Sequence, residues 1–232
     1  MKAGHWFLGM AAVFSILIIL LISSFEIGIY SDFGWYEKEY EKYKVTEDLE
    51  MKIEDVMGVT EEMMTYLRGN REDLVVWTTV DGEEREFFNE REKAHMVDVQ
   101  HLFFGGLKLR FGAVIVLLLS LGGLIFTKGN CRRILPKSFL IGTGVFFGLA
   151  GCLGVMVASD FNKYFFLFHE IFFDNDLWLL DPATDLMIRM LPEGFFFDMV
   201  IRIGGIFVGM LAILFGISAV VLRRQKTNKK DL

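Results

Sequence analysis

Apolar residues along this chain gather into four long blocks that are separated by polar segments. The first, third and fourth blocks match the roughly 20 helical residues that span the ~30 Å hydrocarbon core of a bilayer. The second block is shorter, and the apolar run at 102–107 extends it on its N-terminal side. The pattern predicts an α-helical integral membrane protein with four transmembrane helices. We expect them at about 6–25, 109–127, 138–158 and 199–222.

Charge differs sharply between the segments that join these blocks. The connector at 127–137 and the C-terminal tail are rich in Lys and Arg, whereas 29 of the 30 acidic residues lie in 26–100 and 159–198. Because cytoplasmic loops carry an excess of Lys and Arg, both termini are expected in the cytoplasm and the two acidic segments outside it. The first block is too long for the apolar core of a secretory signal, and no Ala-x-Ala site follows, which favours an uncleaved anchor.

The extracytoplasmic insertion at 26–100 is expected to be a small α+β region. Apolar residues recur every three or four positions over 36–68, which predicts a helix that ends at the Gly-Asn pair 69–70. Most charges of this helix are expected to form a solvated face. Two short strands are predicted around the Asp81-Gly82 turn, a frequent hairpin sequence.

A further helix is expected to begin near residue 90 and to run into the second membrane block. Asn89 and Glu92 have the spacing of a capping box, which would start it. This helix carries the sequence HMVDVQH, in which His95, Asp98 and His101 are three residues apart and therefore neighbours on one face. A carboxylate beside an imidazole raises its basicity and fixes the position of its proton. A purely structural role for these histidines near a membrane interface is the alternative.

The segment at 159–198 is too apolar for a free loop and is expected to lie at the outer membrane interface, where aromatic residues accumulate. Within its run of Phe and Leu stand His169 and Glu170, with four aspartates following. Charge at membrane depth is unfavourable, so these groups either reach water or have a functional role. Turns are predicted at Asp181-Pro182 and at 192–194.

Common enzyme motifs are absent from the sequence. It has no G-x-S-x-G elbow and no phosphate-binding G-x-x-x-x-G-K-[ST] loop, and the HEIFF sequence has Phe173 where a zinc-binding H-E-x-x-H helix needs histidine. The acidic outer segments argue against nucleic acid as a partner. Cys131 and Cys152 fall in the cytoplasmic connector and in the third block, so neither a disulfide nor a Cys-x-x-Cys metal site is expected.

Two motifs and the order of the membrane helices resemble the lipoprotein intramolecular transacylase (Lit) family of Gram-positive bacteria. The motifs are HMVDV at 95–99 and FHEIFFDNDLWLLDPATDLMIRMLPEGFF at 168–196. The resemblance implies an acyltransferase of the plasma membrane that acts on diacylglyceryl-modified lipoproteins on the extracytoplasmic side. It implies transfer of the sn-2 acyl chain to the α-amino group of the N-terminal cysteine, which gives the lyso form. The family's two central histidines fall on His95 and His169.

Elementary chemistry is compatible with that activity. An α-amino group has a pKa of about 7.7–8.0, so a useful fraction is neutral and nucleophilic at pH 7. Donor and acceptor belong to one molecule, which a site can hold in reactive geometry. Conversion of an ester to an amide is downhill, so no cofactor, metal or nucleotide is expected.

We predict His169 as general base and His95, oriented by Asp98, as general acid, although the two roles could be exchanged. Supporting residues are expected to be Asp98, Glu170, Lys108, Arg110 and Arg189, and one of the three basic side chains would stabilise the developing oxyanion.

Two other functions remain open from the sequence. One is a metal-dependent membrane hydrolase that uses His95, His101 and His169 with nearby carboxylates, although their spacing gives it no support. The other is a non-enzymatic four-helix scaffold or sensor with an acidic ectodomain. The latter accounts for 26–100 equally well but leaves His169 without a purpose.

Overall fold

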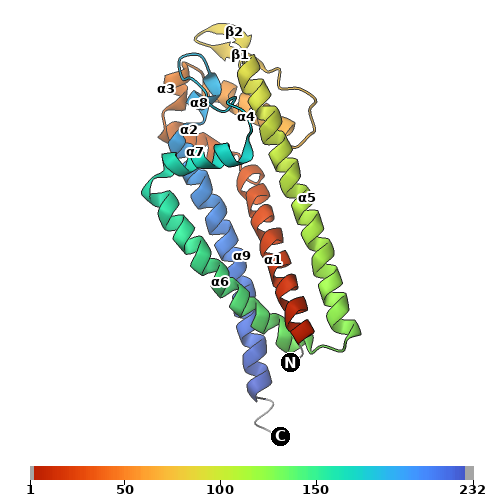
Figure 1. Cartoon of the computed structure of the whole chain (residues 1–232). Coiled ribbons are helices and arrows are strands. Elements are labelled where there is room, and N and C mark those ends of the chain that lie inside the picture. Colours follow the sequence, from red (N-terminus) through yellow and green to blue (C-terminus); the bar gives the residue numbers. More distant parts are fainter. Residues whose placement is uncertain (1–2, 228–232) are drawn as a thin grey trace. The chain divides into compact units, whose positions relative to one another are not determined.

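The structure is a computed structural model that describes residues 3–227 (Figure 1). These residues form two compact units. The first unit contains the described residues up to 27, residues 106–159 and the described residues from 203 onward. The second contains residues 28–105 and 160–202.

Within the described residues, four helices are long and apolar enough to cross a membrane. They are α1 (Ala3–Tyr30), α5 (Glu90–Phe126), α6 (Cys131–Ser159) and α9 (Glu193–Thr227). Their order and number confirm the four predicted membrane helices. The sidedness of the membrane and the place of the termini stay predictions.

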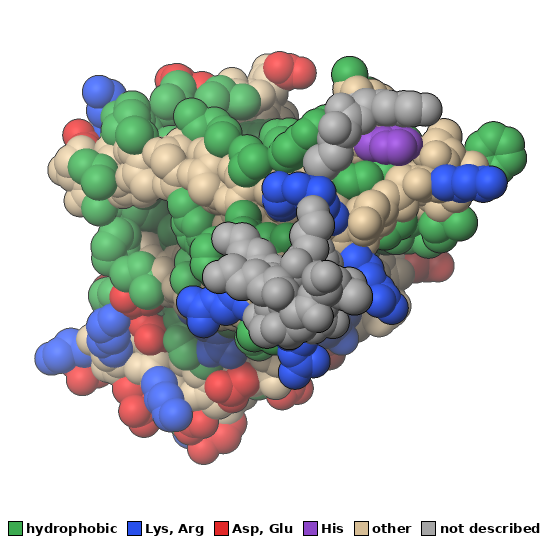
Figure 2. Space-filling model, turned by 90° about the horizontal axis from the view of Figure 1, so that it is seen from below, with side chains coloured by type: hydrophobic (Ala, Val, Ile, Leu, Met, Phe, Trp, Pro, Cys, Tyr) green, Lys and Arg blue, Asp and Glu red, His purple; other side chains and the backbone are tan. Residues whose placement is uncertain are grey.

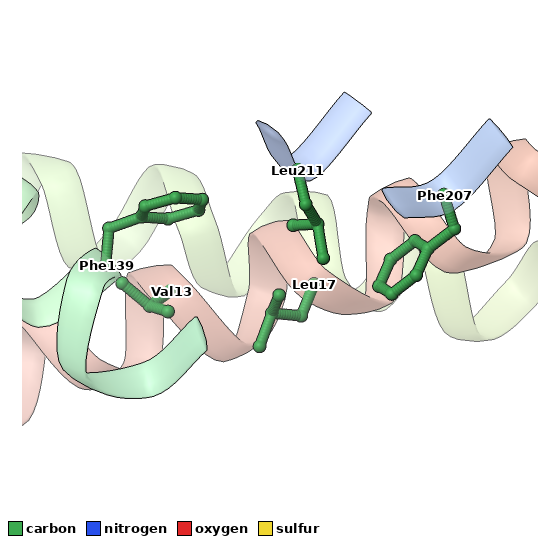
Figure 3. Close-up of a cluster of buried hydrophobic side chains, with 5 residues drawn as sticks. All are labelled: Val13, Leu17, Phe139, Phe207 and Leu211. Carbon is green, nitrogen blue, oxygen red and sulfur yellow. The ribbon is translucent and has the colours of Figure 1, made fainter. Parts of the chain in front are cut away.

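The first unit is built around α1, which contacts the three other long helices. Val13 and Leu17 of α1 pack with Phe139 of α6 and with Phe207 and Leu211 of α9 (Figure 3). Glycines allow close approach in this unit: a Cβ at Gly142 of α6 would lie 2.7 Å from Cγ1 of Val13, and one at Gly123 of α5 would lie 3.2 Å from a methyl of Leu8. Small residues at such crossings bring helix backbones together, which strengthens packing where water provides no driving force.

Basic side chains lie at the end of the first unit where the described chain begins and ends. Figure 2 views the molecule from this end and shows Lys and Arg side chains among hydrophobic ones. Arg110 of α5 forms an ion pair with Glu26, near the C-terminal end of α1.

The second unit contains the remaining helices and both strands. The helix predicted over 36–68 is wrong as a single element: the chain forms α2 (Gly34–Lys42), α3 (Val45–Leu49) and α4 (Ile53–Leu67). The breaks fall at Lys44 and Glu50, which have φ angles of 55° and 54° in the left-handed region. These turns let α3 bury Val45 and Leu49, and neither break has the glycine that usually marks such a turn.

The predicted hairpin and its turn are confirmed. Strands β1 (Trp77–Val80) and β2 (Glu83–Glu86) pair antiparallel, with Val80 opposite Glu83. Asp81 and Gly82 both have positive φ, 52° and 75°, as a two-residue type I′ turn requires.

The segment at 159–198 is folded, as its apolar composition predicted. It contains α7 (Phe161–Phe172) and α8 (Leu186–Met190), and α9 begins at Glu193. Asp160 caps α7 by accepting a hydrogen bond from the Lys163 amide at 3.1 Å. The chain turns at both predicted places, where the Thr184 amide bonds the Asp181 carbonyl and the Phe195 amide bonds the Pro192 carbonyl.

Candidate active site

The start of α5 is fixed by the predicted capping box. The Asn89 amide donates to Oε2 of Glu92 at 2.7 Å, and the Glu92 amide donates to Oδ1 of Asn89 at 3.0 Å. The box extends beyond its helix, because Oε1 of the fully buried Glu92 accepts the Met187 amide at 2.6 Å. His95 follows Glu92 by three residues on the same helix. The anchored start of α5 therefore fixes the position of His95 in the second unit.

Asp185 ties the segment before α8 to the same point. Its carboxylate accepts hydrogen bonds from the Asn89 side chain at 2.7 Å, the Asp181 amide at 2.7 Å and the Thr184 hydroxyl at 3.0 Å. Burial raises the pKa of Asp185, but these hydrogen bonds and the Arg91 charge outweigh it and hold the pKa below its usual range. Asp185 is therefore an ionised anchor of the fold.

Helix α7 presents His169 on its buried face. His169 is 8% exposed, whereas Ile171 and Phe172 beside it are 66% and 53% exposed. Phe165, one turn earlier, contacts the imidazole with a ring-centroid distance of 4.3 Å. An amphipathic helix thus turns its histidine inward and leaves aromatic side chains outward.

The two predicted histidines come together in the second unit. The rings of His95 and His169 are 6.0 Å apart between centroids and inclined by 37°, and both side chains are buried. Phe173 contacts both rings, at 5.3 Å and 5.5 Å. Trp178 stacks on His169 with centroids 5.0 Å apart and an angle of 29°.

Hydrogen bonding determines where neutral His169 carries its proton. Its Nδ1 lies 2.7 Å from the Phe165 carbonyl oxygen. A carbonyl oxygen only accepts, so Nδ1 carries the hydrogen and Nε2 keeps its lone pair. Burial lowers the pKa of His169 by more than this hydrogen bond raises it. The ring is therefore neutral near pH 7.

His95 differs in its hydrogen bonding, since its Nδ1 is buried and has no hydrogen-bond partner among the described residues. Buried polar atoms are nearly always paired, so an unpaired one in a site marks a place for a ligand or water. The pair therefore offers a proton acceptor on His169 and an unsatisfied imidazole on His95.

Asp98 lies on the same face of α5 but does not hydrogen-bond His95. Its carboxylate accepts instead from the Asn175 side chain at 2.8 Å. Among the described side chains, no hydrogen bond joins Asp98 to His95, so the predicted orientation of His95 by Asp98 stays a prediction. Glu170 is exposed on α7, next to but not within the histidine pair.

Of the three predicted basic residues, only Arg189 lies in the same unit as the histidines. Arg189 of α8 is bonded to Asp48 of α3, with 2.9 Å between Nε and the carboxylate. Lys108 and Arg110 belong to the first unit, where Arg110 pairs with Glu26. The basic residue that sequence reasoning missed is Arg91, which precedes His95 by one helical turn and whose i, i+4 spacing could have indicated it.

No group of three His, Cys, Asp or Glu side chains in the described part of the chain is placed to hold a metal ion. His101, the third histidine of the metal hypothesis, is exposed on α5.

The chain matches one family model and one curated relative. The family model for "Lipoprotein intramolecular transacylase Lit" matches residues 10–196. An uncharacterized protein of Aquifex aeolicus (strain VF5) is 35% identical over 133 residues. That match covers 56% of this chain and 53% of the relative, so the chain spans about half the length of that relative.

Solved structures resemble the chain over almost its whole length. The membrane integral lipoprotein intramolecular transacylase Lit from Bacillus cereus superposes with a TM-score of 0.78 at 19% identity, covering 96% of this chain and 98% of that chain. A histidine-to-alanine mutant of that protein gives a TM-score of 0.74 at 19% identity, covering 96% of each chain. A histidine-to-arginine mutant gives 0.73 at 18% identity, covering 97% and 94%. At these identities the likeness shows the fold.

Proposed function

Because the chain belongs to the lipoprotein intramolecular transacylase family, we propose that it moves an acyl chain within a diacylglyceryl-modified lipoprotein. The acyl chain leaves the sn-2 ester of the glyceryl group and is transferred to the α-amino group of the lipoprotein's N-terminal cysteine. The products are an amide and a free glyceryl hydroxyl, so the reaction consumes neither water nor a cofactor. The observation that carries the proposal is the buried pair of His95 and His169.

His169 acts as the general base. Its Nδ1–H bond to Phe165 leaves Nε2 free to accept a proton, and burial keeps the ring neutral. As the amine nitrogen attacks the ester carbonyl, Nε2 takes the proton that the nitrogen must lose. The α-amino group with a pKa of about 7.7–8.0 supplies enough neutral amine at pH 7.

His95 acts as the general acid. The departing glyceryl oxygen needs a proton; His95, whose buried Nδ1 has no partner among the described residues, passes one to it and regains one from His169, which has taken the amine proton, so that both rings end as they began. Each such transfer accelerates a reaction by typically 10²–10⁴-fold. The separation of 6.0 Å between ring centroids leaves the two histidines close enough to serve the two atoms of one ester.

The aromatic surroundings suit a substrate with acyl chains. Phe166, Leu167, Phe168, Ile171 and Phe172 are exposed on α7, on the helix that carries His169. Such a face lies favourably at a membrane interface. We place the site on the extracytoplasmic side of a multi-pass membrane protein, on the positive-inside argument.

The test is product formation in a bacterium that lacks N-acylating enzymes. The wild-type chain is expected to give lyso-form lipoproteins, detected by mass spectrometry of lipoprotein N-termini. His95→Ala and His169→Ala are each expected to remove the product, whereas His101→Ala, at an exposed histidine of the same helix, keeps it. Lyso product in both single variants at the wild-type level would refute the mechanism.

The same assay separates the other functions. Product that disappears on chelation and returns with a divalent metal would favour the metal-dependent enzyme. A cellular phenotype that survives loss of both histidines, without lyso product in the wild type, would favour a scaffold or sensor.

A further inference from the structure

A short segment between α7 and α8 is attached to α5 on both sides of His95. We name residues 174–178 the strap. The Asn175 side chain donates to Oδ2 of Asp98 at 2.8 Å. Arg91 donates to the Asp176 carbonyl oxygen, and its guanidinium lies 3.6 Å from the Asp176 carboxylate.

The spacing of these contacts on α5 places His95 between them. Arg91, His95 and Asp98 follow one another at intervals of four and three residues, which puts all three on one helical face. The strap is therefore bound one turn before and one turn after His95.

Inside the strap, Asn175 also fixes Trp178. The indole Nε1–H donates to the Asn175 carbonyl at 2.9 Å, and Oδ1 of Asn175 accepts the Leu177 amide at 3.0 Å. Asn175 thus uses its amide group on α5 and its acceptors on its own turn. Trp178, held in this way, lies over the ring of His169 and meets Phe166 edge-on at 5.3 Å.

We propose that the strap is a positioning element in which Asn175, bound to Asp98, holds Trp178 against His169 and so fixes the plane of its imidazole. The inference rests on the proposed function for its catalytic consequence. One hydrogen bond at Nδ1 fixes the position of that atom but lets the ring tilt about it. The stacked indole restricts that tilt, aims Nε2 and keeps water off one side of the ring. Asp98 then supports the site through Asn175 and Trp178.

The first test reads the position of Trp178 without using activity. Carbethoxylation of His169 by diethyl pyrocarbonate, followed by peptide mass spectrometry, measures how well the ring is covered. Trp178→Ala is expected to raise the rate of modification at His169 about tenfold or more, while Trp178→Phe, which keeps a ring there, stays near wild type. His101, exposed on α5, serves as the internal reference.

The second test addresses the bond between Asn175 and Asp98. Asn175→Asp sets two carboxylates against each other and is expected to raise His169 modification by about fivefold, the effect of losing one hydrogen bond. Adding Asp98→Asn restores a donor and an acceptor in exchanged places and is expected to bring the rate back. Asp174→Asn, at an exposed neighbour in the strap, is the matched control.

The catalytic consequence is read from pH profiles of lyso-product formation, taken as the ratio of variant to wild type so that the ionisation of the substrate amine cancels. His95 of α5 is the titratable group that faces His169, with Arg91 and Asp98 one turn to either side. Uncovering His169 in Trp178→Ala moves its pKa toward the ordinary value of about 6.5, so the ratio falls as the pH falls toward and below that value. Trp178→Phe gives a flat ratio.

The outcomes separate the two proposals. If wild type makes no lyso product, the proposed function fails while protection of His169 is still measurable. If wild type is active but Trp178→Ala and Asn175→Asp leave His169 modification unchanged, the strap has no positioning role. Failure of the Asp98→Asn exchange to rescue Asn175→Asp would likewise overturn it.

Discussion

Two aromatic clusters in the second unit are built from similar side chains but leave their polar atoms in different states. The core cluster joins Trp35, Tyr36, Tyr40 and Phe195, with ring centroids 5.2–6.3 Å apart. The histidine cluster joins His95, Phe165, His169, Phe173 and Trp178.

Hydroxyl groups of the core cluster are paired within the protein. Tyr36 donates to the Ile29 carbonyl at 2.9 Å. Tyr40 lies 2.7 Å from the Thr60 hydroxyl, which itself donates to the Val56 carbonyl at 2.9 Å, so Tyr40 is the donor. A cluster with both tyrosine hydroxyls bonded in this way stabilises the fold.

The histidine cluster is satisfied only in part. His169 uses one nitrogen on Phe165, and Nδ1 of His95 has no partner among the described residues. An unpaired buried polar atom destabilises a protein by about 1–3 kcal/mol. Aromatic packing is common to both clusters. The difference is that the histidine cluster contains a buried nitrogen without a hydrogen-bond partner among the described residues, whereas both tyrosine hydroxyls of the core cluster are bonded.

His169→Phe is the change with the largest expected effect, because it keeps an aromatic ring and removes the proposed general base. Lyso-product formation is expected to fall by about 10²–10⁴-fold. The free energy of unfolding is expected to change by only about 1 kcal/mol, since the ring remains and the Phe165 carbonyl loses one hydrogen bond but keeps the helical bond from the backbone amide of residue 169. Product assays and thermal unfolding in detergent measure the two effects. A loss of about 3–5 kcal/mol in the free energy of unfolding, as for a core aromatic residue, would mean that His169 belongs to the core.

Tyr40→Ala is expected to show the opposite pattern. Removing a fully buried aromatic side chain costs about 3–5 kcal/mol of stability. The activity of the protein that remains folded is expected to stay near wild type, because Tyr40 belongs to the other cluster. Tyr40→Phe is the control and should cost only about 1 kcal/mol for the lost hydrogen bond. A selective loss of activity in Tyr40→Phe would erase the distinction between the clusters.

Glu92→Gln tests a buried polar group that stands one turn from His95 yet is fully bonded. Both carboxylate oxygens accept backbone amides, from Asn89 and Met187. Glutamine has one acceptor oxygen and would turn its NH₂ toward the other amide, so we expect a loss of about 1–3 kcal/mol in unfolding free energy. Thermal unfolding measures it, and a variant as stable as wild type would refute the anchoring role. Asn175→Ala, which leaves this box intact, is the control.

The parts of the structure that the sequence predicted are those set by local pattern. Four apolar blocks became four long helices, Asp81-Gly82 formed its turn, and Asn89 with Glu92 formed its box. Lys44 and Glu50 broke the predicted helix over 36–68 because tertiary packing, without a local glycine, imposed left-handed turns.

The sequence pointed to both histidines of the candidate site, but it did not reveal the contacts of Asp98 and Arg189. His95 and His169 came from motif resemblance and the chemistry of imidazole, and the structure places their rings together. The partners of Asp98 and Arg189 are Asn175 and Asp48, from segments distant in sequence. A charged side chain bonds whichever group the fold brings near, which spacing along one helix cannot show.

The pH dependence of stability is expected to distinguish the two clusters. The histidine cluster contributes to the loss of stability at acid pH (the acid edge), and the core cluster to the loss at alkaline pH (the alkaline edge). Burial lowers the pKa of His169, so as the pH falls below about 6.5 the unfolded state binds more protons and stability declines. Burial raises the pKa of Tyr36 and Tyr40, so as the pH rises past about 10 the unfolded state loses protons first and stability again declines.

For each edge, one variant should reduce the loss of stability there without changing the loss at the other edge. His169→Phe is expected to lessen the acid decline and to leave the alkaline one, and Tyr40→Phe is expected to do the reverse. Thermal unfolding across pH, read as the difference from wild type, cancels the carboxylates that titrate in all three proteins. Tyrosinate absorbance follows the alkaline edge independently. If His169→Phe left the acid edge untouched, the imidazole would not be a buried neutral base, and the contrast between a satisfied core and an unsatisfied site would lose its chemical basis.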